Sequence, residues 1–175
     1  MRRLAAAAAD LAPALCAAAL HEAGHLAACR ALGVPLRRFR LSPFGAVIDY
    51  DASRLAFRQE ILIAAAGPVA NLLGVLVCLP GPCGRRRALF GVSCLALAFF
   101  NLLPIRTLDG GTILAAALEA RLSWPTAARA ARAVSAVFSA LLFAAAAAAQ
   151  LRSGGSLSLL ALSVWLLTRI VTDGG

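Results

Sequence analysis

Five apolar segments follow one another along the chain, and the first four are close to the length of about 20 residues that a helix needs to cross a bilayer. They are residues 11–32, 57–79, 85–103, 126–150 and 157–171. Lipid offers no hydrogen-bonding partner to peptide groups, so a spanning segment must pair its own backbone, as a helix does. The sequence therefore predicts a bundle of apolar helices.

Composition supports membrane insertion of the whole chain. Hydrophobic residues make up 61% of its 175 residues and charged residues 14%, with a mean hydropathy of +0.83. Soluble domains have about 45–50% apolar and about 25% charged residues. We therefore expect an all-α polytopic protein of the cell membrane, with about five to six transmembrane or half-membrane helices. Residues 1–175 are expected to form one membrane-embedded domain, with a core over about 11–120 and accessory helices over about 126–172.

The chain carries a formal net charge of +9, and all 17 of its basic residues are arginine. Arginines that flank apolar segments are expected at the headgroup level of a bilayer. The sequence has no basic helix with interleaved aromatic residues, so a nucleic-acid partner is not expected. The lipid bilayer is the partner that this charge favours.

Residues 36–50 differ from the apolar segments around them. They mix β-branched and aromatic residues with Pro43 and Gly45, which is typical of two short strands around a turn. Backbone of this kind cannot face lipid unpaired. We therefore predict a short β-hairpin at the interface or against the helices. Gly33, with Pro35 behind it, is expected to end the helix that precedes the hairpin.

The first apolar segment contains both histidines of the chain, in the run His21-Glu22-Ala23-Gly24-His25. Positions four apart on a helix lie on one face, so both imidazoles can reach one metal ion. A glutamate beside the first histidine can take a proton from metal-bound water. The pattern predicts a catalytic Zn²⁺, one per chain, with His21 and His25 as ligands and Glu22 as the general base. The alternative is that both histidines lie in the protein core, where hydrogen bonds satisfy their ring nitrogens.

A catalytic zinc needs a third protein ligand, because its fourth position is kept for water. Asp109 is the best candidate, since it lies in a segment broken by Pro104 and Gly110 between apolar sequences, where a carboxylate is costly. It could also be the N-cap of a helix beginning at Gly110, and the two roles are compatible. Cys29 lies four residues after His25 on the same helical face and is a further candidate. The other carboxylates that could serve are Asp10, Asp49, Asp51, Glu60, Glu119 and Asp173.

Two asparagines, Asn71 and Asn101, are the other polar side chains inside apolar sequence. Either could hydrogen-bond the substrate backbone or a developing oxyanion, so both are candidate substrate-binding residues. Interhelical hydrogen bonding explains each of them equally well. With zinc and Glu22 as the base, the reaction class is metal-assisted hydrolysis of an amide bond.

Three separated motifs resemble those of the site-2 proteases, which are intramembrane zinc metalloproteases. They are residues 21–25, residues 67–71 (Gly-Pro-Val-Ala-Asn) and residues 101–111, from Asn-Leu-Leu-Pro to Leu-Asp-Gly-Gly. The run at 41–47 is similar to the branch that includes the sporulation protease acting on a membrane-tethered sigma-factor precursor. The resemblance covers about residues 15–120. It implies that His21, His25 and Asp109 bind zinc and that Glu22 is catalytic.

The resemblance also implies regulated intramembrane proteolysis of a transmembrane or membrane-tethered protein, with a membrane regulator as a further possible partner. One departure lies at Arg106-Thr107, which replaces the more apolar, proline-containing sequence usual in the family before Leu-Asp-Gly.

Two other functions compete with proteolysis. A membrane scaffold of the same fold that cleaves nothing would be favoured by loss of a ligand or of Glu22, and all four residues are present. A metal transporter would need further polar residues spread along its helices, whereas residues 11–32 offer the clustered histidine pair with its glutamate.

Overall fold

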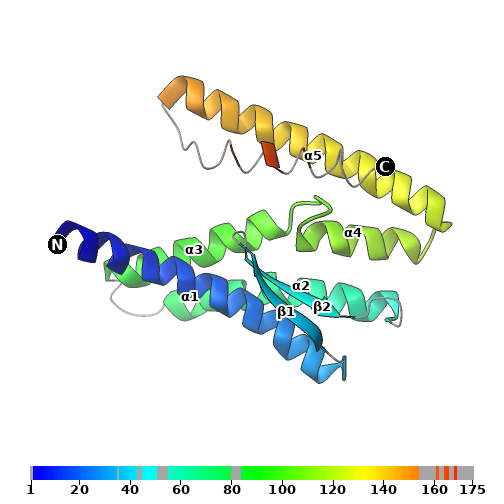
Figure 1. Ribbon diagram of the computed structural model, residues 1–175, viewed down its shortest axis with the longest axis horizontal. Coiled ribbons are helices and arrows are strands. Elements are labelled where there is room, and N and C mark those ends of the chain that lie inside the picture. The colour runs from blue at the N-terminus through cyan, green and yellow to red at the C-terminus, as the bar shows by residue number, and fades with distance from the viewer. Residues whose placement is uncertain are drawn as a thin grey trace. The chain divides into compact units, whose positions relative to one another are not determined.

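The computed structural model describes residues 2–34, 36–42, 45–50, 55–79 and 84–153, together with residues 161, 164, 165 and 168. The chain divides into two compact units, Met1–Leu102 and Leu103–Gly175, and each is described by itself. In Figure 1 the colour runs from blue to green along the first unit and from green towards red along the second. The sequence motifs are distributed over both units.

Among the described residues, the first unit contains three helices and a two-stranded sheet. The helices are α1 (Arg2–Ala31), α2 (Phe57–Cys78) and α3 (Arg85–Asn101). They match three of the apolar segments, although α1 begins well before the predicted start at residue 11. Each helix packs against the other two (Figure 1). The prediction of apolar helices is confirmed for this unit.

The backbones of α1 and α2 approach closely because small residues face each other. A Cβ atom at Gly24 would lie 2.8 Å from the Cβ of Ala70 and 2.9 Å from the carbonyl carbon of Ala66. One at Gly74 would lie 2.7 Å from a methyl carbon of Leu20. The neighbours of Gly24 include backbone, so a larger residue there would force the helices apart. Membrane helices use small residues in this way to gain van der Waals packing.

The turn that ends α1 contains Gly33, as the sequence predicts. Gly33 has a φ of 66°, in the left-handed region that favours glycine. Its amide donates to the carbonyl of Arg30 at 3.2 Å, and the amide of Val34 donates to the carbonyl of Cys29 at 2.9 Å. The side chains of Cys29 and Val34 pack with Ile63 of α2 in a buried apolar cluster. Cys29 is therefore part of the packing between the two helices.

Two strands occupy the segment in which the sequence predicts a hairpin. β1 (Leu36–Ser42) and β2 (Gly45–Tyr50) pair antiparallel, with Phe39 opposite Ile48. Residues 43 and 44, between the strands, lie outside the described residues. Among the described strands each has only the other as its partner, so each presents a second edge.

The second unit contains α4 (Asp109–Glu119) and α5 (Trp124–Ser153), which pack against each other. The loop before α4 is tied to α5, because the backbone amide of Arg106 donates to Oγ of Ser135 at 3.0 Å. A Cβ at Gly111 would lie 2.7 Å from Cα of Arg106, so the loop passes close over the first turn of α4. The donor is the backbone amide of Arg106, which any residue except proline could supply.

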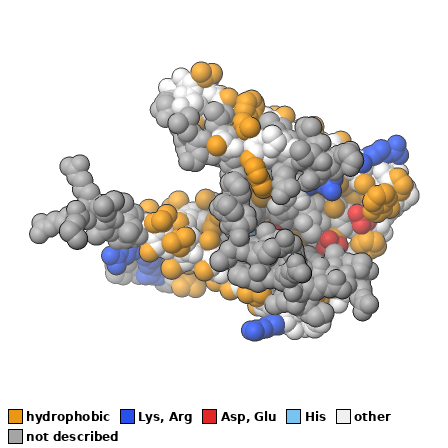
Figure 2. All heavy atoms as spheres, in the orientation of Figure 1, with side chains coloured by type: hydrophobic (Ala, Val, Ile, Leu, Met, Phe, Trp, Pro, Cys, Tyr) orange, Lys and Arg blue, Asp and Glu red, His pale blue; other side chains and the backbone are white. Residues whose placement is uncertain are grey.

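α2 and residues Trp124–Arg152 of α5 are long and apolar enough to cross a membrane, by length and composition. On α2, the side chains of Leu73 and Val77 are 56% and 70% exposed. Figure 2 shows hydrophobic side chains of this kind on the described surface. Large apolar side chains turned outward fit a lipid-facing surface. The predicted total of five to six transmembrane or half-membrane helices stays a prediction, since most of residues 157–171 lie outside the described residues.

We predict that Gly33→Ala lowers the free energy of unfolding by about 1 kcal/mol, because a side chain in the left-handed region is strained. Nothing lies within 4 Å of the added Cβ, so no new contact offsets the strain. Gly84→Ala is the matched control, since Gly84 also has open space but has a φ of −68°. It should stay within about 0.5 kcal/mol of the parent. Denaturant titration in detergent measures both, and equal losses would contradict the role given to the positive φ.

Candidate metal centre

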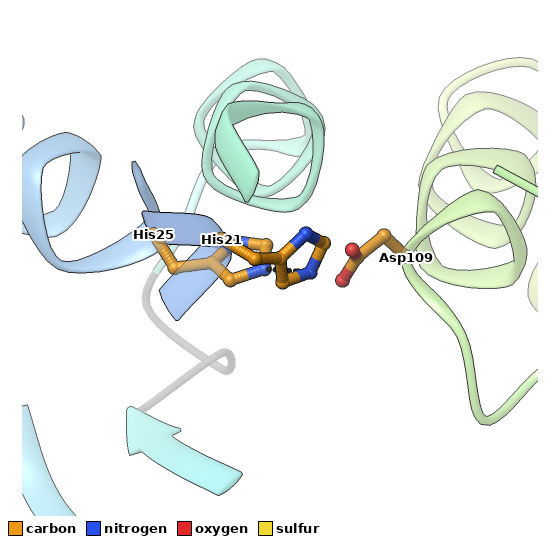
Figure 3. Close-up of side chains that lie close together, drawn as sticks. All are labelled: His21, His25 and Asp109. Carbon is orange, nitrogen blue, oxygen red and sulfur yellow. Dashed lines mark hydrogen bonds between the residues drawn. The ribbon is translucent and has the colours of Figure 1, made fainter. Parts of the chain in front are cut away.

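Both histidines are positioned by α1 where this helix meets α2. His21 is buried, with 6% of its surface exposed, and His25 is half-buried. Their spacing places them one turn apart, and the rings meet edge to face with centroids 4.8 Å apart (Figure 3). The two Nε2 atoms lie 3.1 Å from each other. The two imidazoles therefore come together as the spacing predicts.

The outer nitrogen of each ring is held by α2. Nδ1–H of His25 donates to the carbonyl oxygen of Ile63 at 2.8 Å. The side-chain amide of Asn71, which is fully buried, donates from Nδ2 to Nδ1 of His21 at 3.2 Å. Hydrogen bonds at the outer nitrogen fix the tautomer and orientation of metal-binding histidines. The neighbouring helix thus orients both rings.

The groups of α2 that meet the histidines lie four residues apart, at Ile63, Gly67 and Asn71, and so share one face. A Cβ at Gly67 would lie 2.6 Å from Cε1 of His25 and 2.8 Å from Cε1 of His21. Only hydrogen fits at this position while the rings stay in place. Sequence reasoning missed the roles of Gly67 and of the Ile63 carbonyl. The four-residue spacing from Gly67 to Asn71 places both on one helix face, and the sequence could have indicated their shared role in this way. The sequence gives no sign of the role of the Ile63 carbonyl, because every residue has a backbone carbonyl.

The histidine pair has the dimensions of a two-nitrogen zinc site. Two nitrogens bound to one tetrahedral zinc at about 2.0–2.1 Å lie about 3.3 Å from each other. The Nε2 atoms are 3.1 Å apart, and both Nδ1 atoms are engaged elsewhere. The residues present therefore fit this metal ion.

Glu22 and Asn101 are the other predicted site residues of the first unit. Glu22 follows His21 on α1 and is half-buried. Asn101, the last residue of α3, donates from Nδ2 to the carbonyl of Leu97, one turn earlier, at 3.0 Å. That bond lies within one helix, unlike the bond between Asn71 and His21. The expectation that the two asparagines bind substrate stays a prediction.

In the second unit, Asp109 is the first residue of α4 (Figure 3). The N-cap position belongs to Leu108, whose backbone is extended and whose carbonyl accepts from the amides of Gly111 and Thr112 at 3.0 and 3.2 Å. The capping role considered for Asp109 thus falls to its neighbour. A carboxylate in the first turn of a helix is stabilised by the positive end of the helix dipole. Carboxylate oxygen is also a donor that zinc accepts.

Comparison with known families decides what kind of protein this is. The model of peptidase family M50 matches residues 14–81 and 87–145, which include all three sequence motifs. The chain belongs to the site-2 protease family. Members of this family are membrane-embedded metalloproteases, and the metal that the family implies is zinc.

Two known proteins are similar to this site-2 protease chain. A Synechocystis protein named as a zinc metalloprotease is 33% identical over 102 residues, which are 54% of this chain and 27% of that protein. The chain thus spans about a quarter of that relative's length. The solved structure of the site-2 protease from Methanocaldococcus jannaschii matches with a TM-score of 0.71 at 20% identity, over 96% of this chain and 78% of that one. At this identity the match shows a shared fold.

We predict that Gly67→Ala weakens zinc binding by this site-2 protease chain by about tenfold or more, because the added Cβ pushes both rings away. Gly74→Ala is the matched control on the same helix, since its Cβ would meet Leu20 and Cys94 and not the histidines. Its zinc affinity should stay close to that of the parent. Competition with a chelator in detergent measures the affinities. Equal zinc affinity of the two variants would show that the rings do not need the space at Gly67.

Proposed function

We propose that this chain is a zinc-dependent intramembrane endopeptidase that cuts a peptide bond in a membrane-embedded or membrane-tethered protein. In this proposal His21, His25 and Asp109 hold one Zn²⁺ per chain, and Glu22 is the general base. The chain is a multi-pass protein of the cell membrane. Family membership and the geometry of the histidine pair support the proposal.

The observation that carries the proposal is the arrangement of the four ring nitrogens. The two Nε2 atoms converge at 3.1 Å, while α2 engages both Nδ1 atoms, through Asn71 and the carbonyl of Ile63. Polar groups buried in apolar surroundings are costly. Histidines that served packing alone would not need convergent inner nitrogens, whereas a metal site requires them.

Donor chemistry supports Asp109 as the third ligand. Imidazole nitrogen and carboxylate oxygen are both donors that zinc accepts, so His21, His25 and Asp109 can supply three protein ligands. Three protein ligands of imidazole and carboxylate type are common in catalytic zinc sites and leave a fourth position for water. Asp109 also lies in the first turn of α4, where the helix dipole favours the charged carboxylate.

Zinc, when bound, acts as a Lewis acid and lowers the pKa of a coordinated water to about 7. Glu22 lies on the same helix as both histidines. Its carboxylate accepts a proton from the attacking water, while the water oxygen bonds to the carbonyl carbon of the scissile peptide. Glu22 then gives this proton to the amide nitrogen as the carbon–nitrogen bond breaks. Asn71 and Ile63 keep the histidine rings oriented during these steps.

The substrate class follows from the membrane setting. A transmembrane helix keeps its peptide groups in internal hydrogen bonds, so it has to unwind before water can attack a carbonyl carbon. β1 and β2 pair only with each other among the described strands. An unwound substrate segment can add to one of their outer edges as a further strand, and pairing through the backbone tolerates many sequences.

Two substitutions separate the metal ligand from the base. Glu22→Gln should retain zinc and lose about 10²-fold or more of its cleavage activity, because the amide keeps the shape but accepts no proton. Asp109→Ala should lose zinc and activity together, whereas Glu119→Ala, at the other end of α4, should retain both. Metal analysis in detergent and cleavage of a single-span substrate measure these outcomes. Full zinc in Asp109→Ala, or near-parental turnover in Glu22→Gln, would refute the corresponding role.

Substrate unwinding is tested by changing the substrate alone. A transmembrane segment with Gly-Pro or Asn-Pro near the scissile bond should be cleaved faster than a polyleucine segment of equal length, because proline removes a helix hydrogen bond. Cleavage rates in detergent or proteoliposomes measure the difference. A polyleucine helix cut as fast as the proline-containing one would rule out both unwinding and strand addition.

A further inference from the structure

A single arginine stands in the apolar stretch around Asp109. Residues 88–118 carry two charged side chains, those of Arg106 and Asp109, and are otherwise uncharged. The side chain of Arg106 is exposed, and its guanidinium has no ion pair or hydrogen bond with the described residues, since the one bond of Arg106 comes from its backbone amide. A charged side chain within apolar membrane sequence is costly and usually serves a partner. Arg106 therefore calls for a partner beyond the described residues.

Three contacts fix the loop from which this side chain extends. The amide of Arg106 donates to Oγ of Ser135 at 3.0 Å, and the amide of Leu108 donates to the carbonyl of Ile105 at 2.8 Å. A Cβ at Gly111 would lie 2.7 Å from Cα of Arg106, so the loop passes directly over the first turn of α4. The side chain of Ile105 is fully buried. The exposed guanidinium thus extends from a fixed point.

That fixed point lies close to the carboxylate proposed as the third zinc ligand. Three peptide units join Arg106 to Asp109, so their Cα atoms lie at most about 11 Å apart. The bond between Leu108 and Ile105 folds the chain between them and shortens this distance further. An extended peptide covers about 11 Å in about three residues. A substrate strand held at the zinc can therefore bring a side chain near its scissile bond to the guanidinium.

We propose that Arg106 is a specificity-determining residue that selects substrates with an aspartate or glutamate within about three residues of the scissile bond. This inference rests on the proposed function and deepens it, because it names a feature of the substrate. A guanidinium binds a carboxylate through two parallel charge-assisted hydrogen bonds, which are stronger where water is partly excluded. The same charge repels a lysine or arginine at that substrate position, so attraction and repulsion act together.

The test changes the side chain of Arg106 and leaves its backbone bond in place. Arg106→Gln and Arg106→Glu both keep the amide that donates to Ser135, so both should fold and hold zinc as the parent does. Their substrates are single-span segments with Gly-Pro near the scissile bond, which carry Asp, Asn or Lys at each nearby position in turn. Values of kcat/KM are measured for the full chain in detergent without anionic lipid.

The parent should cleave the Asp substrate about tenfold faster than the Asn substrate at one or two adjacent positions. Arg106→Gln should lose this preference, and Arg106→Glu should reverse it, so that Lys becomes the best residue there. Arg121→Glu is the matched control, because Arg121 is also exposed but follows the other end of α4. This control should keep the parental ranking.

Binding without turnover gives a second readout. In the Glu22→Gln background, a fluorescent Asp peptide should bind more tightly than its Asn counterpart, and added salt or Arg106→Gln should remove the difference. Equal treatment of Asp and Asn at every position, or a preference for Asp that survives in Arg106→Gln, would overturn the inference, while cleavage by the parent would keep the proposed function standing. An unchanged ranking with weaker binding of anionic vesicles by Arg106→Gln would also overturn it, since the side chain would then serve the lipid. A parent that cleaves none of the substrates would overturn both.

Discussion

The close contact between the backbones of α1 and α2 is the interaction on which the first unit depends. In a bilayer the hydrophobic effect gives helices little reason to associate, and van der Waals packing has to hold them. Gly24 on α1 and Gly67 and Gly74 on α2 remove the side chains that would keep the helices apart. Backbone and short side chains then meet directly, and this brings a carbonyl and an amide of α2 within hydrogen-bonding distance of the histidines.

This packing also explains how polar groups are tolerated in an apolar bundle. His21, Asn71 and His25 would each be costly alone in such surroundings. Joined in one chain of hydrogen bonds that ends on the carbonyl of Ile63, each ring has a partner on both nitrogens. The hydrogen bonds from His25 to Ile63 and from Asn71 to His21 therefore depend on the space at Gly67, because a larger residue there would push the rings away and break them.

The second unit positions Asp109 by other means. The loop before α4 is held by the backbone of Arg106, which bonds to Ser135 of α5, and it passes tightly over Gly111. Backbone contacts of this kind place the start of α4, and with it Asp109, without depending on the loop's side chains. Arg106 lies where the chain departs from the proline-containing family pattern, and a proline at position 106 could not donate the bond to Ser135.

The sequence alone determined the helices, the end of the first one at Gly33, the segment that forms β1 and β2, and the meeting of His21 with His25. These features follow from local rules: apolar length, the preference of glycine for positive φ, and the helical repeat. The partners of the outer nitrogens were decided by the tertiary structure. Asn71 and Asn101 look alike in sequence, yet the first bonds to His21 on another helix and the second to its own helix. Which partner an amide reaches depends on how two helices are rotated and how closely they approach, and contacts distant in sequence set both.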